Sequence, residues 1–556
     1  MTAFRLAPAT ERQLHASSLA NQLLANRGFT TADEVAAFLT PDYDRDRHDP
    51  LLMPGMEAAV ERIQTALSKG ERIAVYADYD CDGIPGAVVL TDFLKAVGHT
   101  NYVTYIPHRH FEGFGLNSEA VEKLHKDTVT LIITIDCGVS DHSAAERASE
   151  LGVDVIITDH HEPKETLPTA VAVVNPKLPG EYPFKELCGA GVVFKLVEAL
   201  IATGDYTLSA DQAKWFLDMV GLATINDMVP LHGENRVFAH YGLTVLRKSR
   251  RPGLQHLLRT ARAKQAFLTE DDVGFTIGPR VNAASRMDTP EDAFTMLATQ
   301  DESEAGTVVA HLENLNNERK GLVAAITKEL HKRIKAFEDI PPVIVMGNPK
   351  WRPALVGLAA TKLAEEYHRP VFLWGRDGNG VVKGSCRSEG VTSIVSLMEA
   401  VHEQFSEYGG HHFSGGFSVK EDALFTFADA LTDAFQRLGN ELQHPEVPLV
   451  DAELTLKDVT DGLVKELRLL APYGVGNPKP LFLFSAVTPA AVNQFGKSKE
   501  HLKLVFDREG GALEAIAFFA SPLSYKVEPK VGESLSSRSR GRIIFYGSPA
   551  DSVTHR

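Results

Sequence analysis

The sequence predicts an α/β protein of several domains, with a parallel sheet in its N-terminal half and a small β-barrel near its C-terminal end. Its 556 residues are too many for one hydrophobic core, and 44% hydrophobic with 23% charged residues is typical of a globular chain. From Ile73 to Asp159 apolar runs alternate with helical stretches, and the alternation returns after Pro341. After Pro445 the pattern changes to short alternating strands. We therefore expect three or four domains.

Three β-branched apolar runs predict the strands of the first sheet. They are "RIAVYA", "TLIITI" and "VDVIIT", and an acidic residue follows each of them. Fully apolar strands that alternate with amphipathic helices are typical of a parallel sheet covered on both faces. Ligands of such sheets gather at the carboxyl ends of the strands, so we expect the acidic residues to lie together.

The remaining elements follow in chain order. Residues 211–225 and 300–337 are expected to be helical, and the second of these to connect two lobes. A smaller α/β unit begins with "PPVIVMG" and continues with a helix in "LVGLAATKLAEEYHRP" and a strand in "VFLWG". The runs "LFLFSAV", "HLKLVFD" and "LEAIAFFA" suit a small OB-like barrel. The alternating pattern of this barrel fades after about Val531, so the sequence does not decide whether the last barrel strand forms.

These elements predict a division into five parts. They are an N-terminal segment, a parallel-sheet domain, a helical connector, a smaller α/β domain and the barrel, at residues 1–50, 51–240, 241–337, 338–444 and 445–556.

The N-terminal stretch, the hydropathy pattern and the spacing of the cysteines predict a cytoplasmic protein without a membrane partner. The stretch "MTAFRLAPATERQ" has charges where a signal peptide needs an apolar core, and no run approaches the roughly 18 apolar residues of a membrane span. The four cysteines lie far apart, which suits a reducing compartment. A net charge of −16 argues mildly against a nucleic-acid partner, although local basic patches can override that average.

The run "DYDCDG" concentrates three carboxylates, Asp78, Asp80 and Asp82, at the end of the first predicted strand. Alternate residues of an extended segment face the same side, and carboxylates so close raise one another's pKa unless a cation binds them. An EF-hand loop would begin in the same way, but Val89 stands where that loop needs a glutamate. A solvated Asp-Gly turn is the other alternative.

Acidic and histidine side chains at the other strand ends favour a metal site. "TIDCG" places Asp136 at the next strand end, and "TDHHEP" places Asp159, His160 and His161 at the following one. "GLATINDMVP" offers Asp227 after an apolar helix, where an aspartate alone is as often a cap or turn former. Carboxylates with one or two imidazoles suit Mn²⁺ or Mg²⁺ better than zinc. Two such ions would catalyse hydrolysis of a phosphoester or phosphoanhydride.

With these motifs the chain resembles the DHH phosphoesterase superfamily and, within it, the RecJ family of single-strand-specific exonucleases. The likeness extends over most of the chain, through "PHRHFEGFGL", "LCGAGVVFKL", "INDMVPL", "GPRVNAASRM", "GSCRS" and "GGHHFSGGFS". It implies a DHH catalytic domain, a smaller DHH-associated domain and an OB fold. The metal ligands that it implies are Asp78, Asp80, Asp82, Asp136, His160 and Asp227.

The resemblance also implies catalytic roles. Asp136 is expected to bridge the two ions, and His161 to lie near the scissile phosphate as electrophile or acid. Asp159 would orient the histidines. Arg109 is expected to bind phosphate.

Two polar segments are expected to bind substrate. "GPRVNAASRM" is interpreted as a polar loop whose arginines suit bidentate phosphate contacts, although a salt-bridged structural loop is equally consistent. "GGHHFSGGFS" has unhindered backbone N–H groups that can hold phosphate, or it is simply a glycine-rich hairpin. The substrate-binding residues expected from these segments and from "GSCRS" are Arg280, Asn282, Arg286, Ser385, Arg387, His411 and Gly415.

The stretch from Arg247 to Lys264 carries seven basic residues and no acidic one. It is either a solvated charged face or a rail that tracks phosphates beside the active site.

The function that the resemblance implies is 5′ to 3′ hydrolysis of single-stranded DNA in repair and recombination. Single-stranded DNA would be the substrate, and a single-strand-binding protein and a RecQ-type helicase would be partners. Two alternatives stay open. One is a DHH-family oligonucleotide or cyclic-dinucleotide phosphodiesterase, although such relatives generally lack the C-terminal β-domain. The other is a non-catalytic nucleic-acid-binding relative, against which the complete ligand set argues.

Overall fold

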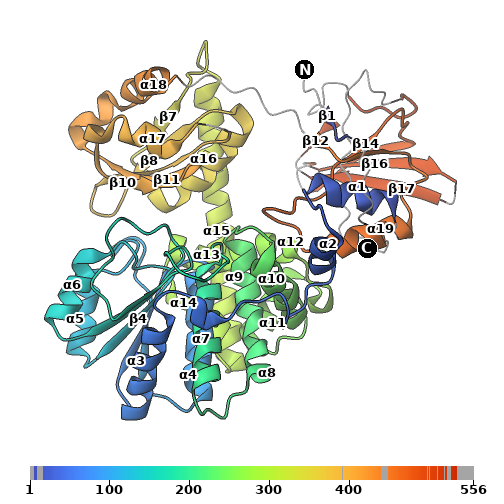
Figure 1. Cartoon of the computed structure of the whole chain (residues 1–556). Coiled ribbons are helices and arrows are strands. Elements are labelled where there is room, and N and C mark those ends of the chain that lie inside the picture. Colours follow the sequence, from blue (N-terminus) through green and yellow to red (C-terminus); the bar gives the residue numbers. More distant parts are fainter. Residues whose placement is uncertain are drawn as a thin grey trace.

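The computed structural model describes residues 5–8, 15, 17–390, 392–439, 449–496, 499, 501–509, 511–518, 520–522 and 528–534. Figure 1 shows three bodies, and the long helix α15 (Glu302–Ile334) joins the lower body to the one at upper left. The third body, at upper right, contains the C-terminal strands together with the N-terminal helices α1 and α2.

A five-stranded parallel sheet forms the core of the first body, in the order β3-β2-β4-β5-β6. Alternate residues of β2 enter two different hydrophobic clusters, because successive side chains of a strand point to opposite faces. Helices therefore cover both faces, as predicted. The strands are β2 (Ile73–Ala77), β3 (Tyr102–Tyr105), β4 (Leu131–Ile135), β5 (Asp154–Thr158) and β6 (Ala172–Val174), and the helices among them are α3 (Met56–Lys69), α4 (Gly83–Ala96), α5 (Ser118–Lys126) and α6 (His142–Glu150).

A helical layer follows the sheet and packs into the same core. Its bounds are α7 (Gly189–Thr203), α8 (Ala210–Ala213), α9 (Leu217–Asn226), α10 (Gly233–Leu246), α11 (Pro252–Ala261), α12 (Glu270–Asp272), a π-helical turn (Val273–Ile277), α13 (Gly278–Met287) and α14 (Glu291–Ala298). The helix predicted over 211–225 is thus confirmed in outline. The predicted domain boundary between residues 240 and 241 lies within α10, and the division into five parts stays a prediction.

One expectation in this layer is wrong. "GPRVNAASRM" is not a loop but the helix α13. Pro279 stands in the first turn, where its missing N–H costs nothing. Val281, Ala283 and Ala284 are buried in the core, and this burial holds the segment helical despite its polar composition.

The predicted connecting helix is confirmed as α15, which contributes to two cores. Leu315 belongs to the core of the first body, and Val323 to that of the second. The second body has a five-stranded sheet in the order β10-β11-β9-β8-β7, antiparallel except between β7 and β8. Its elements are β7 (Ile344–Gly347), α16 (Pro353–Tyr367), β8 (Val371–Arg376), β9 (Val382–Arg387), α17 (Ile394–Glu399), β10 (Phe405–Gly410), β11 (Ser414–Val419) and α18 (Phe427–Arg437).

The C-terminal body contains the predicted short strands. β15 (Ala491–Phe495), β16 (His501–Arg508) and β17 (Gly511–Ala517) form an antiparallel sheet, and β13 (Ala452–Leu454) pairs in parallel with β14 (Phe482–Phe484). β12 (Leu449–Val450) pairs with β1 (Arg5–Leu6) near the N-terminus. Residues 535–556, where the last barrel strand was left open, lie outside the described residues.

The N-terminal helices pack into this C-terminal core. Leu23 and Leu24 of α1 (Ser18–Asn26) and Phe38 of α2 (Ala32–Leu39) share one hydrophobic cluster with α19 (Asp461–Leu470) and with the strands. Arg236 of α10 joins this body to the first, because its guanidinium donates to the carbonyl oxygens of Phe38 and Leu470.

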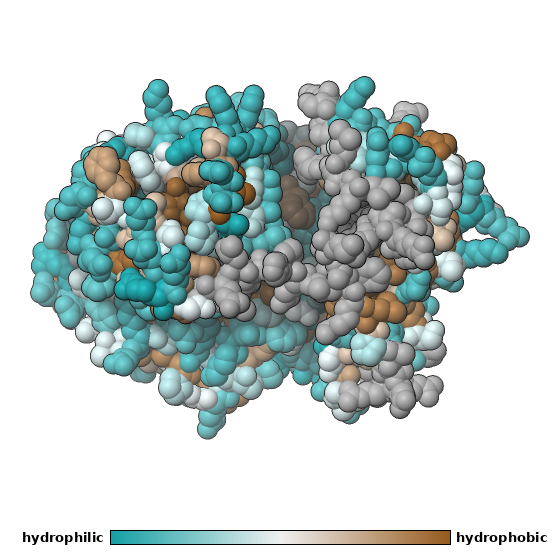
Figure 2. Space-filling view, turned by 90° about the horizontal axis from the view of Figure 1, so that it is seen from above, coloured by the Kyte–Doolittle hydropathy of each residue, from teal (hydrophilic) through white to brown (hydrophobic). Residues whose placement is uncertain are grey.

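The face in Figure 2 is mostly hydrophilic, with apolar residues in small groups. No helix in the described part of the chain is long and apolar enough to cross a membrane.

Candidate two-metal active site

The carboxylates of "DYDCDG" lie in a tight turn between β2 and α4. The side chain of Asp80 caps this turn, since its Oδ1 accepts from the backbone N–H groups of Asp82 (2.8 Å) and Gly83 (3.2 Å). Only glycine fits at position 83, because a Cβ there would lie 2.5 Å from the carbonyl oxygen of Asp78. The glycine that ends the motif is therefore what lets the three aspartates converge.

The N-terminus of α7 holds Asp82. Its two carboxylate oxygens accept from the backbone N–H groups of Gly189 (2.6 Å) and Ala190 (2.8 Å), which are unpaired in the first turn of a helix. A Cβ on Gly189 would lie 2.6 Å from the Cβ of Asp136, so glycine is also needed for this close approach.

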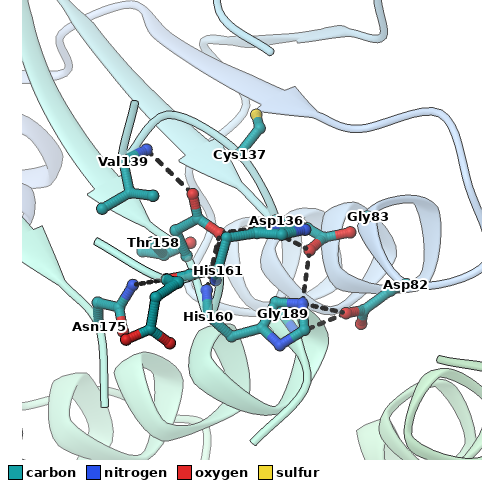
Figure 3. A network of polar contacts seen from close by, with 12 residues as sticks. Asp82, Gly83, Asp136, Cys137, Val139, Thr158, His160, His161, Asn175 and Gly189 are labelled. Carbon is teal, nitrogen blue, oxygen red and sulfur yellow. Dashed lines mark hydrogen bonds and ion pairs between the residues drawn. The ribbon is translucent and has the colours of Figure 1, made fainter. Parts of the chain in front are cut away.

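Asp136 follows β4 directly, in the left-handed region with φ +60°. This backbone conformation is costly for a residue with a side chain and is concentrated at functional sites. The Oδ1 atom of Asp136 lies 3.2 Å from Nε2 of His160. Figure 3 shows the His160 ring directed toward Asp82 and Asp136.

Asp159 is buried and orients both histidines. Its Oδ1 lies 2.7 Å from Nδ1 of His161 and accepts from the backbone N–H groups of His160 and His161, while its Oδ2 accepts from Val139. The pKa of Asp159 is lowered, because these hydrogen bonds and the His161 ring outweigh burial. Asp159 therefore stays an acceptor that keeps Nδ1 of His161 occupied and leaves Nε2 for other partners.

Three overlapping groups of ligand atoms could hold metal ions, and within each group the atoms lie within 4.8 Å of one another. The groups are Asp78, Asp80 and Asp136; Asp82, His160 and Asp227; and Asp136, His160 and His161. Asp136 occurs in two of them, so its carboxylate can serve two ions. Asp227, at the end of α9, brings its Oδ2 within 3.7 Å of Nε2 of His160.

The electrostatics of the site call for cations. The Oδ1 atoms of Asp78 and Asp136 are buried without a hydrogen-bond partner, which is costly for a carboxylate in the folded protein. Burial, and after it the charge of Asp80, raises the pKa of Asp82 to about 7. Burial lowers the pKa of His160 to about 3, so its ring is neutral and can ligate a metal. The residues present fit a pair of hard divalent ions.

Three arginines converge beside this cluster from three parts of the chain. They are Arg109 after β3, Arg286 in α13 and Arg387 at the end of β9. Burial and the charges of Arg109, Arg319 and Arg387 lower the pKa of Arg286 to about 9. Among the described residues none of the three forms an ion pair with a carboxylate, so their guanidinium groups could bind an anion.

The other residues of α13 have structural contacts. Nε of Arg280 lies 2.6 Å from Glu313, and its guanidinium also donates to the carbonyl of Thr276. These contacts favour the salt-bridged alternative for Arg280. Oδ1 of Asn282 accepts from the backbone N–H of Cys81 at 3.1 Å, so Asn282 supports the metal-ligand turn.

The glycine-rich hairpin β10–β11 reaches the site from the second body. The rings of His411 and His161 are stacked, with centroids 6.3 Å apart. Gly415 pairs with Cys386 of β9, and the carbonyl of Gly415 lies 3.4 Å from the Arg387 guanidinium. Ser385 lies on the same strand, and a Cβ at Gly357 of α16 would meet its Oγ at 3.2 Å.

The basic stretch 247–264 is not a continuous charged face. Arg251 is buried and pairs with Asp218 and Asp92, each at 2.8 Å. Arg247 donates to the carbonyl of Leu268. Arg251 therefore cannot belong to a phosphate rail, whereas Arg250 is exposed.

Sequence reasoning did not single out two residues near the site. Phe114, inside the quoted "PHRHFEGFGL", packs edge-on against His161 with ring centroids 5.6 Å apart. Arg319 of α15 is close enough to lower the pKa of Arg286, and its own Nε is buried without a partner. An arginine in a long polar helix carries no signal of its own, so only the fold could reveal it.

Family models match the three bodies in turn. The N-terminal domain of the DHH family matches residues 72–224, the DHHA1 domain matches residues 341–437, and the RecJ OB domain matches residues 450–535. These matches confirm the predicted fold class, a parallel-sheet DHH domain with a smaller α/β domain and a C-terminal OB domain.

Curated relatives match most of this chain in sequence. The single-stranded-DNA-specific exonuclease RecJ of Dickeya dadantii is 32% identical over 93% of this chain and 92% of its own length. RecJ of Escherichia coli is 32% identical over 90% of this chain and 89% of its own length. RecJ of Bacillus subtilis is 35% identical, and the chain spans 65% of that protein.

Solved structures of a RecJ protein also match this chain. RecJ from Thermus thermophilus in complex with Mn²⁺ has a TM-score of 0.75 and 31% identity, over 93% of this chain and 73% of that one. The complex of the same protein with Mg²⁺ has a TM-score of 0.68 and 28% identity over 94% and 73%. The family models, the relatives that match over nearly their full length and the solved structure all point to one family. The chain belongs to the RecJ family of single-stranded-DNA-specific exonucleases.

Proposed function

We propose that this chain is an exonuclease that degrades single-stranded DNA from its 5′ end by two-metal hydrolysis of phosphodiester bonds. One observation carries the proposal. A buried cluster of carboxylates with unpartnered oxygens lies beside His161 and beside three arginines that form no ion pair with any carboxylate in the described part of the chain. The first group suits two divalent cations and the second suits the phosphates of a strand that the cations would act on.

The ions would be Mn²⁺ or Mg²⁺, held by Asp78, Asp80, Asp82, Asp136, His160 and Asp227. When bound, they supply an activated water and stabilise the charge of the leaving oxygen. Asp136, at its left-handed turn, would serve both ions, because its carboxylate belongs to two of the three ligand groups. The helix α7 holds Asp82 in position by donating two backbone N–H groups, which favour its ionised form against burial and the charge of Asp80.

His161 is the proposed electrophile or acid at the scissile phosphate. Burial lowers its pKa, but the hydrogen bond and charge of Asp159 raise it more, so the net shift is upward. The protonated ring can donate from Nε2 to a phosphate oxygen while Nδ1 stays bonded to Asp159. Arg109, Arg286 and Arg387 would hold neighbouring phosphate oxygens, with Ser385, His411 and Gly415 closing the site from the second body.

The test compares long single strands, duplexes and dinucleotides. We expect Mn²⁺-dependent loss of a 5′ label from long single strands, with little attack on blunt duplex. Turnover of the dinucleotide alone would instead support an oligonucleotide phosphodiesterase, and binding without turnover a non-catalytic relative. Asp136→Ala should be inert, and full activity in that variant would overturn the metal assignment.

The proposal extends to the cellular setting. A DNA exonuclease with this substrate would act in DNA repair and recombination, in the cytoplasm of a bacterial cell. A single-strand-binding protein and a RecQ-type helicase, which expose and deliver single strands, are the partners that we propose. Affinity measurements with each purified partner test this extension separately from the nuclease assay.

A further inference from the structure

Tyr79 stands between two of the proposed metal ligands, in the second position of "DYDCDG". Tyr79 is only 8% exposed. The hydroxyl forms no hydrogen bond with any described residue. The ring rather than the hydroxyl therefore has to account for this burial.

The guanidinium of Arg109 lies over the ring of Tyr79. The Cζ atom of Arg109 lies 4.7 Å from the ring centroid, within the range of a cation–π interaction. Arg109 has no hydrogen bond or ion pair with any side chain in the described ranges, and its neighbours Arg286 and Arg387 repel it. Among the described residues the aromatic face is thus the side-chain contact of this guanidinium, with the charge of Asp78 attracting it from nearby, and it leaves the N–H groups available for an anion.

The same ring also connects Arg109 with the histidine. Tyr79 meets Phe114 edge-on, with centroids 6.5 Å apart, and Phe114 meets His161 edge-on at 5.6 Å. The four side chains form a continuous row from Arg109 to the proposed acid. Such contacts hold planar groups in definite orientations at little entropic cost.

We infer that Tyr79 is a positioning residue that holds Arg109 over its ring. The guanidinium then faces the bound DNA strand at a fixed separation from His161. The inference deepens the proposed function and rests on it. Tyr79 acts through Arg109 in binding, so its loss is expected to weaken substrate binding without removing the metal ligands on either side of it.

The experiment measures kcat and KM on a 5′-labelled single strand with saturating Mn²⁺. Tyr79→Leu should raise KM about tenfold and leave kcat within about twofold, since a uniform binding contact is lost. Tyr79→Phe should match the wild type, because it keeps the ring. Mn²⁺ binding measured by calorimetry should be the same in all three proteins.

A double-mutant cycle shows whether the effect passes through Arg109. In an Arg109→Ala background, Tyr79→Leu should add little further change in KM. If the two substitutions multiply instead, or if Tyr79→Phe is as defective as Tyr79→Leu, the inference is overturned. An inactive wild type would refute the proposed function, whereas active wild type with multiplicative effects would refute the role of Tyr79 alone.

The chain supplies a matched control in a second arginine–tyrosine pair. Tyr43 is 7% exposed, and the Cζ atom of Arg47 lies 3.6 Å from its ring centroid. Its hydroxyl bonds Glu198, nine residues beyond the Gly189 end of α7 and thus away from the metal cluster. Tyr43→Leu should lower the Tm as Tyr79→Leu does but leave KM unchanged. An equal rise in KM would mean that general loosening explains both variants.

Discussion

The imidazole of His411, at the tip of a hairpin in the second body, lies parallel to that of His161 with an interplanar angle of 13°. The hairpin thus places a ring from the DHHA1 domain against the proposed acid of the DHH domain. Asp159 fixes one side of His161, and His411 restricts the other.

His411→Ala should therefore lower kcat/KM about tenfold, because the acid loses a surface that orients it. The fall should be measured on a single strand with Mn²⁺, and Mn²⁺ affinity should not change. His412→Ala is the control, since the His412 ring packs on Phe413 instead. Equal losses in both variants would contradict a specific role for the stacked pair.

Removal of metal should make stability fall as the pH rises. Burial and the charges of Asp82, Asp80 and Asp78 raise the pKa of Asp136 in the folded state. A raised folded pKa means that the folded state binds more protons than the unfolded state, in which the pKa is about 3.9, so stability is lost above about pH 4. Asp136→Asn removes this contribution.

In chelator, the Tm of Asp136→Asn should exceed that of the wild type by several degrees at pH 8, and by less at pH 5. With excess Mn²⁺ the order should reverse, because only the wild type keeps the complete ligand set. Asp127→Asn, at an exposed position, should show no such pH dependence. A constant difference across the pH range would refute the electrostatic account.

Gly83→Ala should displace the metal-ligand turn. The added methyl would lie 2.5 Å from the Asp78 carbonyl, so the backbone must move and carry the carboxylates with it. We expect at least a tenfold loss of Mn²⁺ affinity by calorimetry and a lower Tm. Gly321→Ala is the opposite case, in the open middle of α15 with nothing within 4 Å of the new Cβ. It should stabilise the chain by about 0.5–1 kcal/mol.

Arg251→Ala should damage the fold rather than DNA binding. It would remove the arginine from Asp218, which keeps the Ser249 hydroxyl, and from Asp92, which keeps Lys95 at 3.9 Å, at a cost of about 3–5 kcal/mol. The Tm should fall sharply while the salt dependence of strand cleavage stays as in the wild type. Arg250→Ala, on the exposed neighbour, should leave the Tm unchanged. A flatter salt dependence in Arg250→Ala would show that this side chain does contact phosphate.

The sequence alone predicts the parallel sheet and the convergence of its acidic strand ends, because both follow from local periodicity. The runs before Asp78, Asp136 and Asp159 are mostly apolar and rich in β-branched residues, and their strands lie side by side in the sheet. The sequence does not predict that "GPRVNAASRM" is helical, since tertiary burial of Val281, Ala283 and Ala284 outweighs polar composition.

Residue roles that depend on a distant partner are the ones that pattern reasoning misses. Glu313, 33 residues after Arg280, forms an ion pair with the Arg280 guanidinium, which the sequence offered as a phosphate ligand. Asn282 supports Cys81 across 201 residues of chain. No local motif marks either partner, and the fold alone brings them together.

The contact of α1 and α2 with the C-terminal strands has a consequence for biosynthesis. These helices leave the ribosome before the residues that complete their hydrophobic cluster, which follow both other bodies in the sequence. Leu23, Leu24 and Phe38 therefore lack the part of their native cluster that α19 and the C-terminal strands supply until those two bodies have been made. Removing α1 and α2, or the C-terminal elements, would expose the apolar side chains of the other group, so these elements behave as one folding unit.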